Sequence, residues 1–497
     1  MAQIIAGGTK LDSGGNVEVI TQTQTTSWTQ LQGKPYITVS AKGIANGLSN
    51  IPNDGADFGP DTTKGATAPG QYGAPYTETT GIQESHNYIP SGHEIRMCEG
   101  NYKCTQTIII SKNIVFSGVP SGTYGLGPMS TATDEVSLFP VNIISGGNQA
   151  TVSLNFSGGT STADVDGFVY FYGITFTGSG NKTYTSEVAI APSSTANQNI
   201  NVQFNNSRIT LYYTCVIVGS SSNNIYVEFA STHSLFDSYL YNALTCNYGE
   251  LYLLYDHINN AAATSNYVSG GSGILVEDTF QKGMVDSCIV ESIGDCLQFL
   301  GSKGHFEIIG GHWYNNLNGY VFHISGDSGE LLYIGMLSIY AGANDSFYFD
   351  SGSAVNNITV NTVYMGGSGS IAFTSTTTIG SNFRFLNVYP TSKITPTLAT
   401  NPPVSGTAYQ NTNPYDIFIS VPITFPTTAS TAMSAYLRVG TSSTAGANPK
   451  FDQFSEPATL ATASGRIWAL KAKVPACQYF EVDVTNATIG TAEVAAA

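Results

Sequence analysis

Three aspartates recur at nearly the same position in successive repeats of this sequence, and their type and spacing could do chemistry. Counted from the first residue of each repeat, Asp237 falls at offset 12 and Asp295 and Asp345 at offset 13. Glu291 lies four residues before Asp295. Paired carboxyl groups hydrolyse glycosidic bonds, about 5–5.5 Å apart for retention of configuration and about 6.5–9.5 Å apart for inversion. A hydrolase built on this chain would therefore use Asp295 with Glu291 or Asp237.

The same acidic column also has a structural interpretation, which we favour. Asn318 occupies the equivalent position in the repeat between Asp295 and Asp345. An Asp or Asn before each strand is the residue that a tight corner requires, because its side chain hydrogen-bonds to the nearby backbone. Another repeat position is shared by three residues: His257, Cys288 and His312.

Aromatic side chains near these carboxylates predict a surface for neutral sugars. Sugar rings stack on aromatic faces, and their hydroxyl groups bond to Asn, Asp and His. We expect about half of the aromatic rings in this region to pack in the core or against another subunit instead. The residues predicted to bind glycan are Trp313, Tyr314, Tyr320, Tyr340 and His312.

Short strands in a repeat of about 25 residues are the elements that must position these side chains. A second apolar strand recurs within each repeat, and Gly, Asn, Ser and Asp gather between strands. This period predicts a right-handed parallel β-helix of about twelve coils, in which strands stack about 4.8 Å apart; the alternative is a β-sandwich with turns every 8–12 residues. The repeats begin at Ile200, Ile225, Leu251, Lys282, Phe306, Leu332, Ile358 and Phe383, at spacings of 25, 26, 31, 24, 26, 26 and 25 residues.

Composition excludes several classes of protein. Only 10% of the 497 residues are charged, the net charge is −16, and the 29 tyrosines outnumber the 18 Lys and Arg together. A nucleic-acid-binding surface needs clustered Lys and Arg, so we expect no nucleic-acid partner. The sequence has no apolar run of 18 residues that could span a membrane. The scarcity of charge also favours an acidic habitat, because few groups then take up protons on unfolding.

The segment NDGADFGPDT, followed by TGIQESHNYI, EIRMCEGNY and TIIISKNIVFSGV, resembles the opening of pectate-lyase-like β-helix proteins. That family includes polysaccharide lyases, polygalacturonase-like hydrolases and viral tailspikes, and the resemblance covers about residues 50–390. It implies a helix that closes the first coil, predicted here at 81–89 with Thr79 or Thr80 as its cap. The catalytic motifs are incomplete: Gly294-Asp295-Cys296-Leu297 lacks the second Asp of the hydrolase motif, and residues 210–383 offer only Lys282 and Lys303 as basic residues.

Composition divides the chain into four segments. We predict an N-terminal attachment arm at 1–45, the parallel β-helix at 46–395, a Pro- and Thr-rich linker at 396–406, and a C-terminal antiparallel β-sandwich at 407–497. The sandwich is similar to the β-structured modules that end many viral fibres and spikes. Cys98 with Cys104, and Cys288 with Cys296, are candidate disulfide pairs.

These features together favour a virion spike or tail fibre, in organisation closest to a tailspike, and the acidic habitat points to an archaeal virus as its source. It would be a homotrimer that binds a host surface glycan or glycoprotein, and its arm would contact other tail or capsid proteins. The start of the sequence lacks a basic region followed by an apolar run, which is expected if virions assemble inside the cell. We expect no cofactor and no metal. The alternatives are a polysaccharide-degrading tailspike or secreted glycoside hydrolase or lyase, and a cellular surface adhesin.

Overall fold

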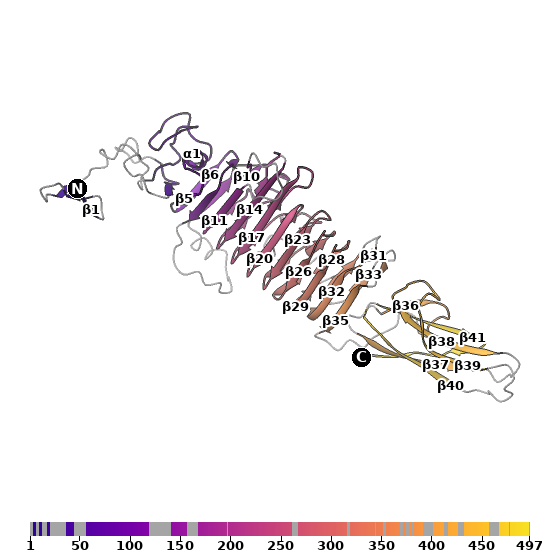
Figure 1. The fold of residues 1–497 in the computed structure, drawn as a ribbon. Coiled ribbons are helices and arrows are strands. Elements are labelled where there is room, and N and C mark those ends of the chain that lie inside the picture. Colours follow the sequence, from indigo (N-terminus) through magenta and orange to yellow (C-terminus); the bar gives the residue numbers. More distant parts are fainter. Residues whose placement is uncertain are drawn as a thin grey trace.

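The computed structural model contains three short strands within residues 3–19 and then describes residues 36–43, 56–118, 141–156, 167–260, 267–315, 319–390 and 401–496. Within these ranges it leaves out residues 196, 343, 351–353, 368–370, 374–377, 380–381, 412–415, 426–431, 457–466 and 477. The described residues form an elongated molecule in which coils stack along one axis (Figure 1). The short strands β1 (Gln3–Ile5), β2 (Thr9–Leu11) and β3 (Val17–Val19) pair with one another in an antiparallel sheet.

The middle of the chain is a right-handed parallel β-helix, as predicted. Each coil contributes strands to three parallel ladders, which we name A, B and C in chain order. Ladder A has twelve strands among the described residues, in agreement with the expected number of coils. These strands are β4 (Tyr36–Val39), β5 (His93–Met97), β8 (Ile114–Gly118), β11 (Gly167–Tyr172), β14 (Gln198–Asn205), β17 (Ile225–Thr232), β20 (Gly249–Leu254), β23 (Lys282–Asp286), β26 (Phe306–Ile309), β29 (Leu332–Ala341), β32 (Ile358–Gly367) and β35 (Phe383–Pro390).

Ladders B and C follow ladder A in each coil. In ladder B the strands are β6 (Gly100–Cys104), β9 (Val141–Ser145), β12 (Thr175–Thr177), β15 (Arg208–Thr210), β18 (Leu235–Asp237), β21 (His257–Asn259), β24 (Ile289–Ser292) and β27 (His312–Asn315), continued by the second halves of β29, β32 and β35. In ladder C they are β7 (Ile108–Ile110), β10 (Ala150–Leu154), β13 (Val188–Pro192), β16 (Thr214–Val218), β19 (Asn242–Cys246), β22 (Ser272–Val276), β25 (Asp295–Phe299), β28 (Phe322–Ile324), β30 (Phe347–Phe349) and β33 (Ile371–Phe373). A short pair, β31 (Ala354–Val355) and β34 (Thr378–Ile379), lies beside them.

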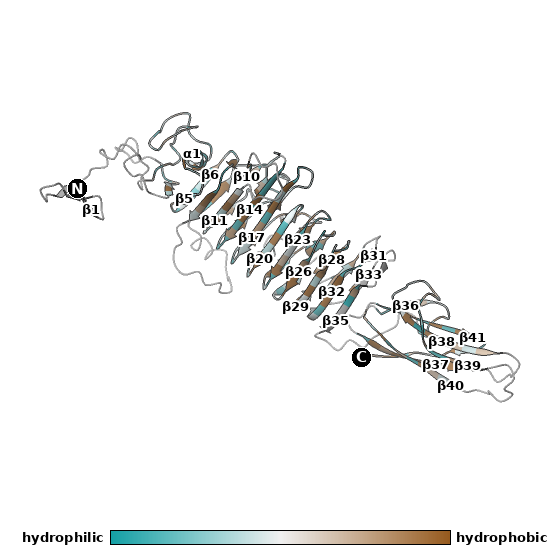
Figure 2. Cartoon of the chain, viewed as in Figure 1, coloured by the Kyte–Doolittle hydropathy of each residue, from teal (hydrophilic) through white to brown (hydrophobic). Residues whose placement is uncertain are grey.

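Alternation of apolar and polar residues explains why the coils stack. In β14 and β17 every second side chain is buried, so Val202 lies above Phe229 and Ile200 above Val227 in the interior. Apolar and polar residues alternate along the strands of the β-helix (Figure 2). The buried side chains form one continuous core along the solenoid.

The corner between ladders A and B is made by a single residue with positive φ in coil after coil. Left-handed backbone costs least for Gly and Asn, which is why the sequence is rich in these residues. Several corners nevertheless carry larger side chains, which strain the backbone by about 1–2 kcal/mol each. The corner residues with φ between 45° and 61° are Asn206, His233, Tyr255, Ser287, Met336 and Thr362, and two further corners use Gly173 and Gly310.

Helix α1 (Ile82–Tyr88) lies at the N-terminal end of the coils, as the sequence predicted. Ile82 and the following Ile89 are buried in the β-helix core. Thr79 Oγ1 accepts a hydrogen bond of 3.1 Å from the backbone N–H of Gln83, whereas Thr80 Oγ1 donates to the Lys103 carbonyl. Thr79 is therefore the hydroxyl that satisfies the helix start, although Gly81 occupies the cap position.

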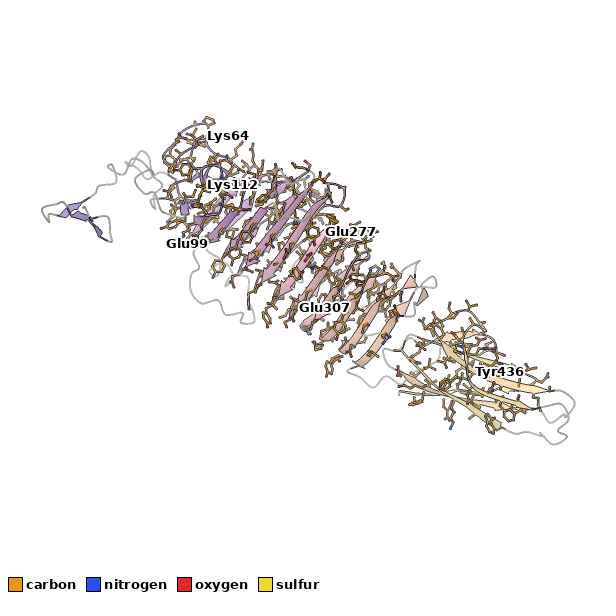
Figure 3. The ribbon with its side chains drawn as sticks, in the orientation of Figure 1. Lys64, Glu99, Lys112, Glu277, Glu307 and Tyr436 are labelled. Carbon is orange, nitrogen blue, oxygen red and sulfur yellow. The ribbon has the colours of Figure 1, made fainter. Side chains whose placement is uncertain are left out.

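The C-terminal segment is an antiparallel β-sandwich, as predicted. Its two sheets bury a separate apolar core, and Ala476 joins the core of the β-helix. Figure 3 shows Tyr436 on this domain and Glu277 and Glu307 on the flanks of the β-helix. One sheet holds β36 (Ala408–Gln410), β41 (Tyr479–Thr485), β38 (Met433–Gly440) and β39 (Lys450–Glu456); the other holds β40 (Ile467–Val474), β37 (Ile417–Thr424), β42 (Thr488–Ile489) and β43 (Glu493–Ala496).

Two expectations about the chain need correction. Strand β4 lies inside the segment assigned to the arm, yet it pairs in parallel with β5, so the β-helix begins by Tyr36. Cys104, Cys288 and Cys296 are free thiols, which excludes both predicted disulfides. Packing in the core explains the presence of these cysteines better than disulfide bonding does, since Cys often packs as a small apolar residue.

Candidate functional site

The predicted site residues divide between two faces of the β-helix. On ladder B, Asp237, Glu291 and Tyr314 lie in one column, with Asn259 between the first two. Asp295 belongs to ladder C, where it is level with Ser272 of the preceding coil. Asp237 and Asp295 therefore do not share a column, contrary to the sequence count. In ladder C, Leu297, Phe322 and Phe347 are register partners. The residues two places before them, Asp295, Tyr320 and Asp345, therefore form one column, so Asp295 and Asp345 share a column as predicted.

The ladder B carboxylates are engaged with neighbouring basic groups. Arg208 binds Asp237 through two contacts, Nε to Oδ1 at 3.0 Å and Nη2 to Oδ2 at 2.6 Å, and so joins adjacent coils. His257 Nε2 lies 3.8 Å from Glu291 Oε2, and this histidine lowers the pKa of Glu291. His257 and His312 share a column with Ile289 between them, and Cys288 is displaced from it by one residue. Asn318 lies outside the described residues.

Trp313 lies in the core, so its predicted place on a glycan-binding surface was wrong. Its side chain is 0% exposed and packs on Phe322, with ring centroids 5.1 Å apart. The reason is the alternation of the strand: His312 and Tyr314 point outward from β27, so Trp313 between them points into the core.

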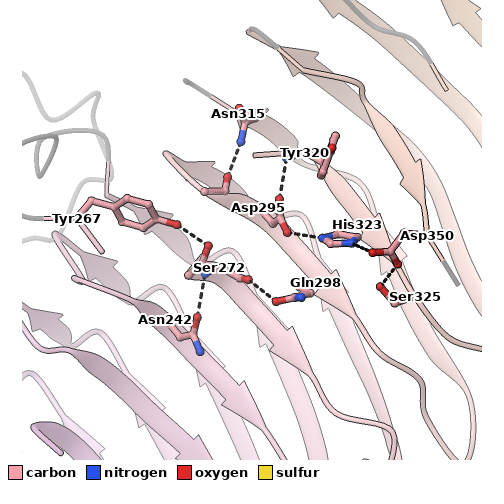
Figure 4. A network of polar contacts seen from close by, with 12 residues as sticks. Asn242, Tyr267, Ser272, Asp295, Gln298, Asn315, Tyr320, His323, Ser325 and Asp350 are labelled. Atoms are coloured by element: carbon pink, nitrogen blue, oxygen red, sulfur yellow. Dashed lines mark hydrogen bonds and ion pairs between the residues drawn. The ribbon is translucent and has the colours of Figure 1, made fainter. Parts of the chain in front are cut away.

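The polar network on ladder C is the best-formed constellation of chemical groups around the predicted residues (Figure 4). His323 lies between two carboxylates, with Nδ1 2.7 Å from Asp295 Oδ2 and Nε2 2.9 Å from Asp350 Oδ2. The other Asp295 oxygen accepts the backbone N–H of Tyr320 at 2.8 Å. Ser325 donates its hydroxyl to the other Asp350 oxygen. The network thus connects three successive coils.

Both ring nitrogens of His323 face carboxylate oxygens, an arrangement that suits an imidazolium ion with two N–H donors. Burial by itself would lower the pKa of His323. The hydrogen bonds and negative charges of Asp295 and Asp350 outweigh that effect and raise the pKa above its ordinary value. The group is a charge-assisted bridge rather than a neutral histidine packed in the wall.

A pair of tyrosines lies on this bridge. Tyr320 and Tyr348 are parallel within 5°, with ring centroids 4.1 Å apart. The ring of each tyrosine meets that of His323 edge to face, at 5.4 Å for Tyr320 and 5.2 Å for Tyr348. His323 and Tyr348 are register partners of adjacent coils, so the backbone ladder itself sets their separation. We call Tyr320 and Tyr348 the tyrosine platform.

Three members of this site were not among the residues predicted from the sequence: His323, Asp350 and Tyr348. The signal for two of them is present, because Phe322-His323-Ile324 and Phe347-Tyr348-Phe349 alternate and their middle residues must point outward. Asp350 could not be found this way. Its contact with His323 depends on the register between coils.

The carboxylate oxygens of this network are all engaged. Each oxygen of Asp295 and of Asp350 already accepts a hydrogen bond. A carboxylate so held is neither a free nucleophile nor a ready proton donor. Within the described residues there is no group of three or more His, Cys, Asp or Glu side chains arranged to hold a metal ion. Helix α1 and the rest of the described chain include no helix that is long and apolar enough to cross a membrane.

No protein-family model and no curated protein matches the chain. Among solved structures it is similar to ORF18 of Geobacillus virus E2, with 12% identity, a TM-score of 0.30, and coverage of 97% of this chain and 83% of that one. The enzymatically active domain of bacteriophage CBA120 tailspike protein 2 has 11% identity and a TM-score of 0.32, over 85% and 74% of the two chains. DFA-IIIase from Arthrobacter chlorophenolicus A6 has 12% identity and a TM-score of 0.31, over 64% and 90%. Scores this low carry no inference about function.

Proposed function

We propose that this protein is a virion spike or tail-fibre protein that attaches to host cells by binding neutral surface glycans at the tyrosine platform. The observation that carries the proposal is the parallel pair Tyr320 and Tyr348, held by the ladder and fixed from beside by His323. The two rings cover each other's inner face, so a sugar would pack an apolar face on an outer ring face and place its hydroxyl groups against the hydrogen-bonding groups nearby.

The charge around the platform supports a neutral ligand. Lys282 and Lys303 are the only lysines or arginines between residues 210 and 383. Lys282 already pairs with Glu250, Nζ to Oε2 at 3.2 Å. A polyanionic glycan would therefore meet carboxylates with little compensating positive charge.

The test is glycan binding by single-ring variants. Tyr348→Ala and Tyr320→Ala should each weaken binding about tenfold, the equivalent of about 1.4 kcal/mol from one stacking ring. Tyr76→Ala removes an exposed tyrosine of the N-terminal loops and is the matched control. The assay uses a host-surface glycan that the wild type binds. If all three variants bound this glycan with equal affinity, the proposed role of the tyrosine platform would be refuted.

Assembly as a homotrimer is part of the proposal. Large apolar side chains are exposed along the corner between ladders A and B, which in a three-sided coil lies opposite ladder C. Tyr255 and Met336 even take the left-handed conformation there, where Gly or Asn would be less strained. The exposed residues along this corner are Tyr255, Ile289, Met336, Tyr340, Tyr364 and Leu386.

Light scattering tests this part of the proposal. We expect a trimer at micromolar concentration and a monomer after Met336→Asp with Tyr364→Asp. A monomeric wild type would contradict it. Tyr314 and Tyr340, whose rings are 5.0 Å apart, and His312 border the same corner, so the trimer experiment also tells whether a subunit covers these predicted glycan contacts.

A second candidate function is hydrolysis of the bound glycan. It is favoured by one observation: His323, whose pKa the two carboxylates raise, lies between Asp295 and Asp350 beside the platform. Incubation with host glycans should then release new reducing ends, and Asp295→Asn should abolish them. Glycan binding without release of new reducing ends would refute hydrolysis and leave attachment as the proposed function.

The order of the segments along the chain is the basis for our proposal of how the protein is placed on the virion. The N-terminal segment before β4 would contact tail or capsid proteins, and the β-helix and sandwich would extend from the particle (Figure 1). Truncation of residues 1–35 should remove the protein from purified particles without loss of glycan binding. Retention of the truncated chain on particles would contradict this role.

A further inference from the structure

The outward face of β11 and β14 carries aromatic side chains beside amides in strict register. On β11, Phe168, Tyr170 and Tyr172 point away from the core in a row, with centroids 6.4 Å and 6.3 Å apart. The row follows the strand, so its three rings are spaced by roughly the length of one hexose residue. Such a row offers successive stacking surfaces to a linear chain of sugars.

The next coil supplies the hydrogen-bonding groups. Across the parallel pairing, Phe168 is level with Asn201, Tyr170 with Gln203 and Tyr172 with Asn205. Amides donate and accept, which matches the hydroxyl groups at the rim of a sugar. The outward residues of the two strands thus alternate between a ring and an amide one strand spacing away, about 4.8 Å.

Two of these amides differ in how they are held. Asn205 Nδ2 donates to the Tyr170 hydroxyl at 3.1 Å and so fixes that ring. Asn201 Oδ1 has no hydrogen-bond partner among the described residues, although it is shielded from solvent. A ligand hydroxyl would supply the missing donor if the Asn201 side chain turned outward.

The face is uncharged. The three rings and three amides carry no formal charge, and the nearest carboxylates on the ladder are Glu228, level with Asn201, and Glu94, level with Val115 of β8. A cationic or anionic partner finds no row of opposite charges here. A neutral chain with many hydroxyl groups fits both rows.

We infer that β11 and β14 form a second binding site, for a linear neutral oligosaccharide lying along the strands. It is distinct from the tyrosine platform because it occupies ladder A rather than ladder C and lies five coils before β28, about 24 Å along the axis. Two sites on one rigid solenoid would let one polysaccharide, or two neighbouring chains, bind with higher avidity than either site gives alone.

Stoichiometry tests the inference. Calorimetric titration with linear neutral hexaoses of glucose, mannose and galactose should give two ligands per chain for the wild type. We expect one for Tyr170→Ala with Gln203→Ala, one for Tyr320→Ala with Tyr348→Ala, and none for the combination. Tyr170→Phe keeps the ring and should keep both ligands, which separates loss of stacking from loss of fold.

The outcomes separate this site from the platform. An unchanged stoichiometry in Tyr170→Ala with Gln203→Ala overturns the second site and leaves the platform intact. Loss of the platform ligand alone, with binding retained on β11 and β14, overturns the proposed role of Tyr320 and Tyr348 instead. A change in oligomeric state in the Tyr170 and Gln203 variant, with unchanged glycan binding, would show that the face is a subunit contact and overturn the inference. Absence of binding of every hexaose to the platform variant also overturns it.

Discussion

Asp256 carries a prediction about how the stability of the β-helix depends on pH. The residue is 1% exposed, at the corner between ladders A and B, and its Oδ1 accepts the backbone N–H of Ser234 at 2.7 Å. Burial raises the pKa of Asp256 to about 8, and the hydrogen bond from Ser234 only partly offsets that effect. Near neutral pH the folded chain therefore holds Asp256 in its protonated form.

The direction in which stability changes with pH follows from the pKa values of Asp256 in the folded and unfolded chain. An unfolded Asp titrates near 3.9, far below the folded value of about 8, so the unfolded chain releases a proton that the folded chain keeps. The stability contributed by this group is fully present below pH 3.9 and is lost as the pH rises to 8. With about 1.4 kcal/mol for each pKa unit, the loss between pH 4 and pH 7 is of order 4 kcal/mol.

The perturbation is Asp256→Asn, which keeps the shape of the protonated carboxyl and removes its titration. Denaturant unfolding at pH 4 and pH 7 should show that the variant gains about 4 kcal/mol relative to the wild type over this interval. Asp278→Asn, at an exposed position, is the matched control and should show little change. Other groups, such as His86, titrate in both proteins and cancel in the difference. A variant and wild type whose stability difference is the same at both pH values would refute the reasoning.

Three further predictions concern histidines and the core. The carboxylates raise the pKa of His323, so its bridge is intact below pH 6.5 and is lost as the pH rises through the raised pKa; glycan affinity should fall at alkaline pH in the wild type and lose this pH dependence in His323→Gln, measured by calorimetry. Burial, aided by the charge of Lys112, lowers the pKa of His86 to about 4, so the stability that neutral His86 gives helix α1 is present above pH 6.5 and lost as the pH falls through 4; hydrogen exchange of the α1 amides should accelerate beyond its intrinsic pH trend, and constant protection would contradict this. Trp313→Ala should cost about 3–5 kcal/mol in chemical unfolding, while the folded variant binds glycan normally.

The fold was predictable because the strongest signals in this sequence are local and repeat. Alternation as in Ile225–Thr232 marks a strand with one buried side, and the recurrence of such strands every 25 residues or so marks the coil. Helix α1 and the change of composition before the sandwich were equally readable. The predicted strand starts were less accurate: Ile200 is level with Val227 rather than Ile225, and Leu251 is level with Phe229.

These errors in the predicted strand starts explain most of the wrong predictions about which site residues share a column. Coils differ in length because turns between ladders gain and lose residues, so equal offsets do not mean equal height. Asp237 was counted into the column of Asp295, although it lies on another ladder. Within one strand, by contrast, parity is reliable, and applied to His312-Trp313-Tyr314 it identifies Trp313 as buried.

Several of the scarce charges in the β-helix connect one coil to the next. Arg208 binds Asp237 across β15 and β18, Lys282 binds Glu250 across β20 and β23, and His323 joins Asp295 to Asp350. These pairs stabilise the stack from its outer surface and leave few unpaired positive charges for a ligand to meet. The outward positions that remain, on the tyrosine platform and on β11 and β14, are aromatic rings and amides. The same low charge that restricts the partners of this chain therefore also supports the neutral glycan that we propose as its ligand.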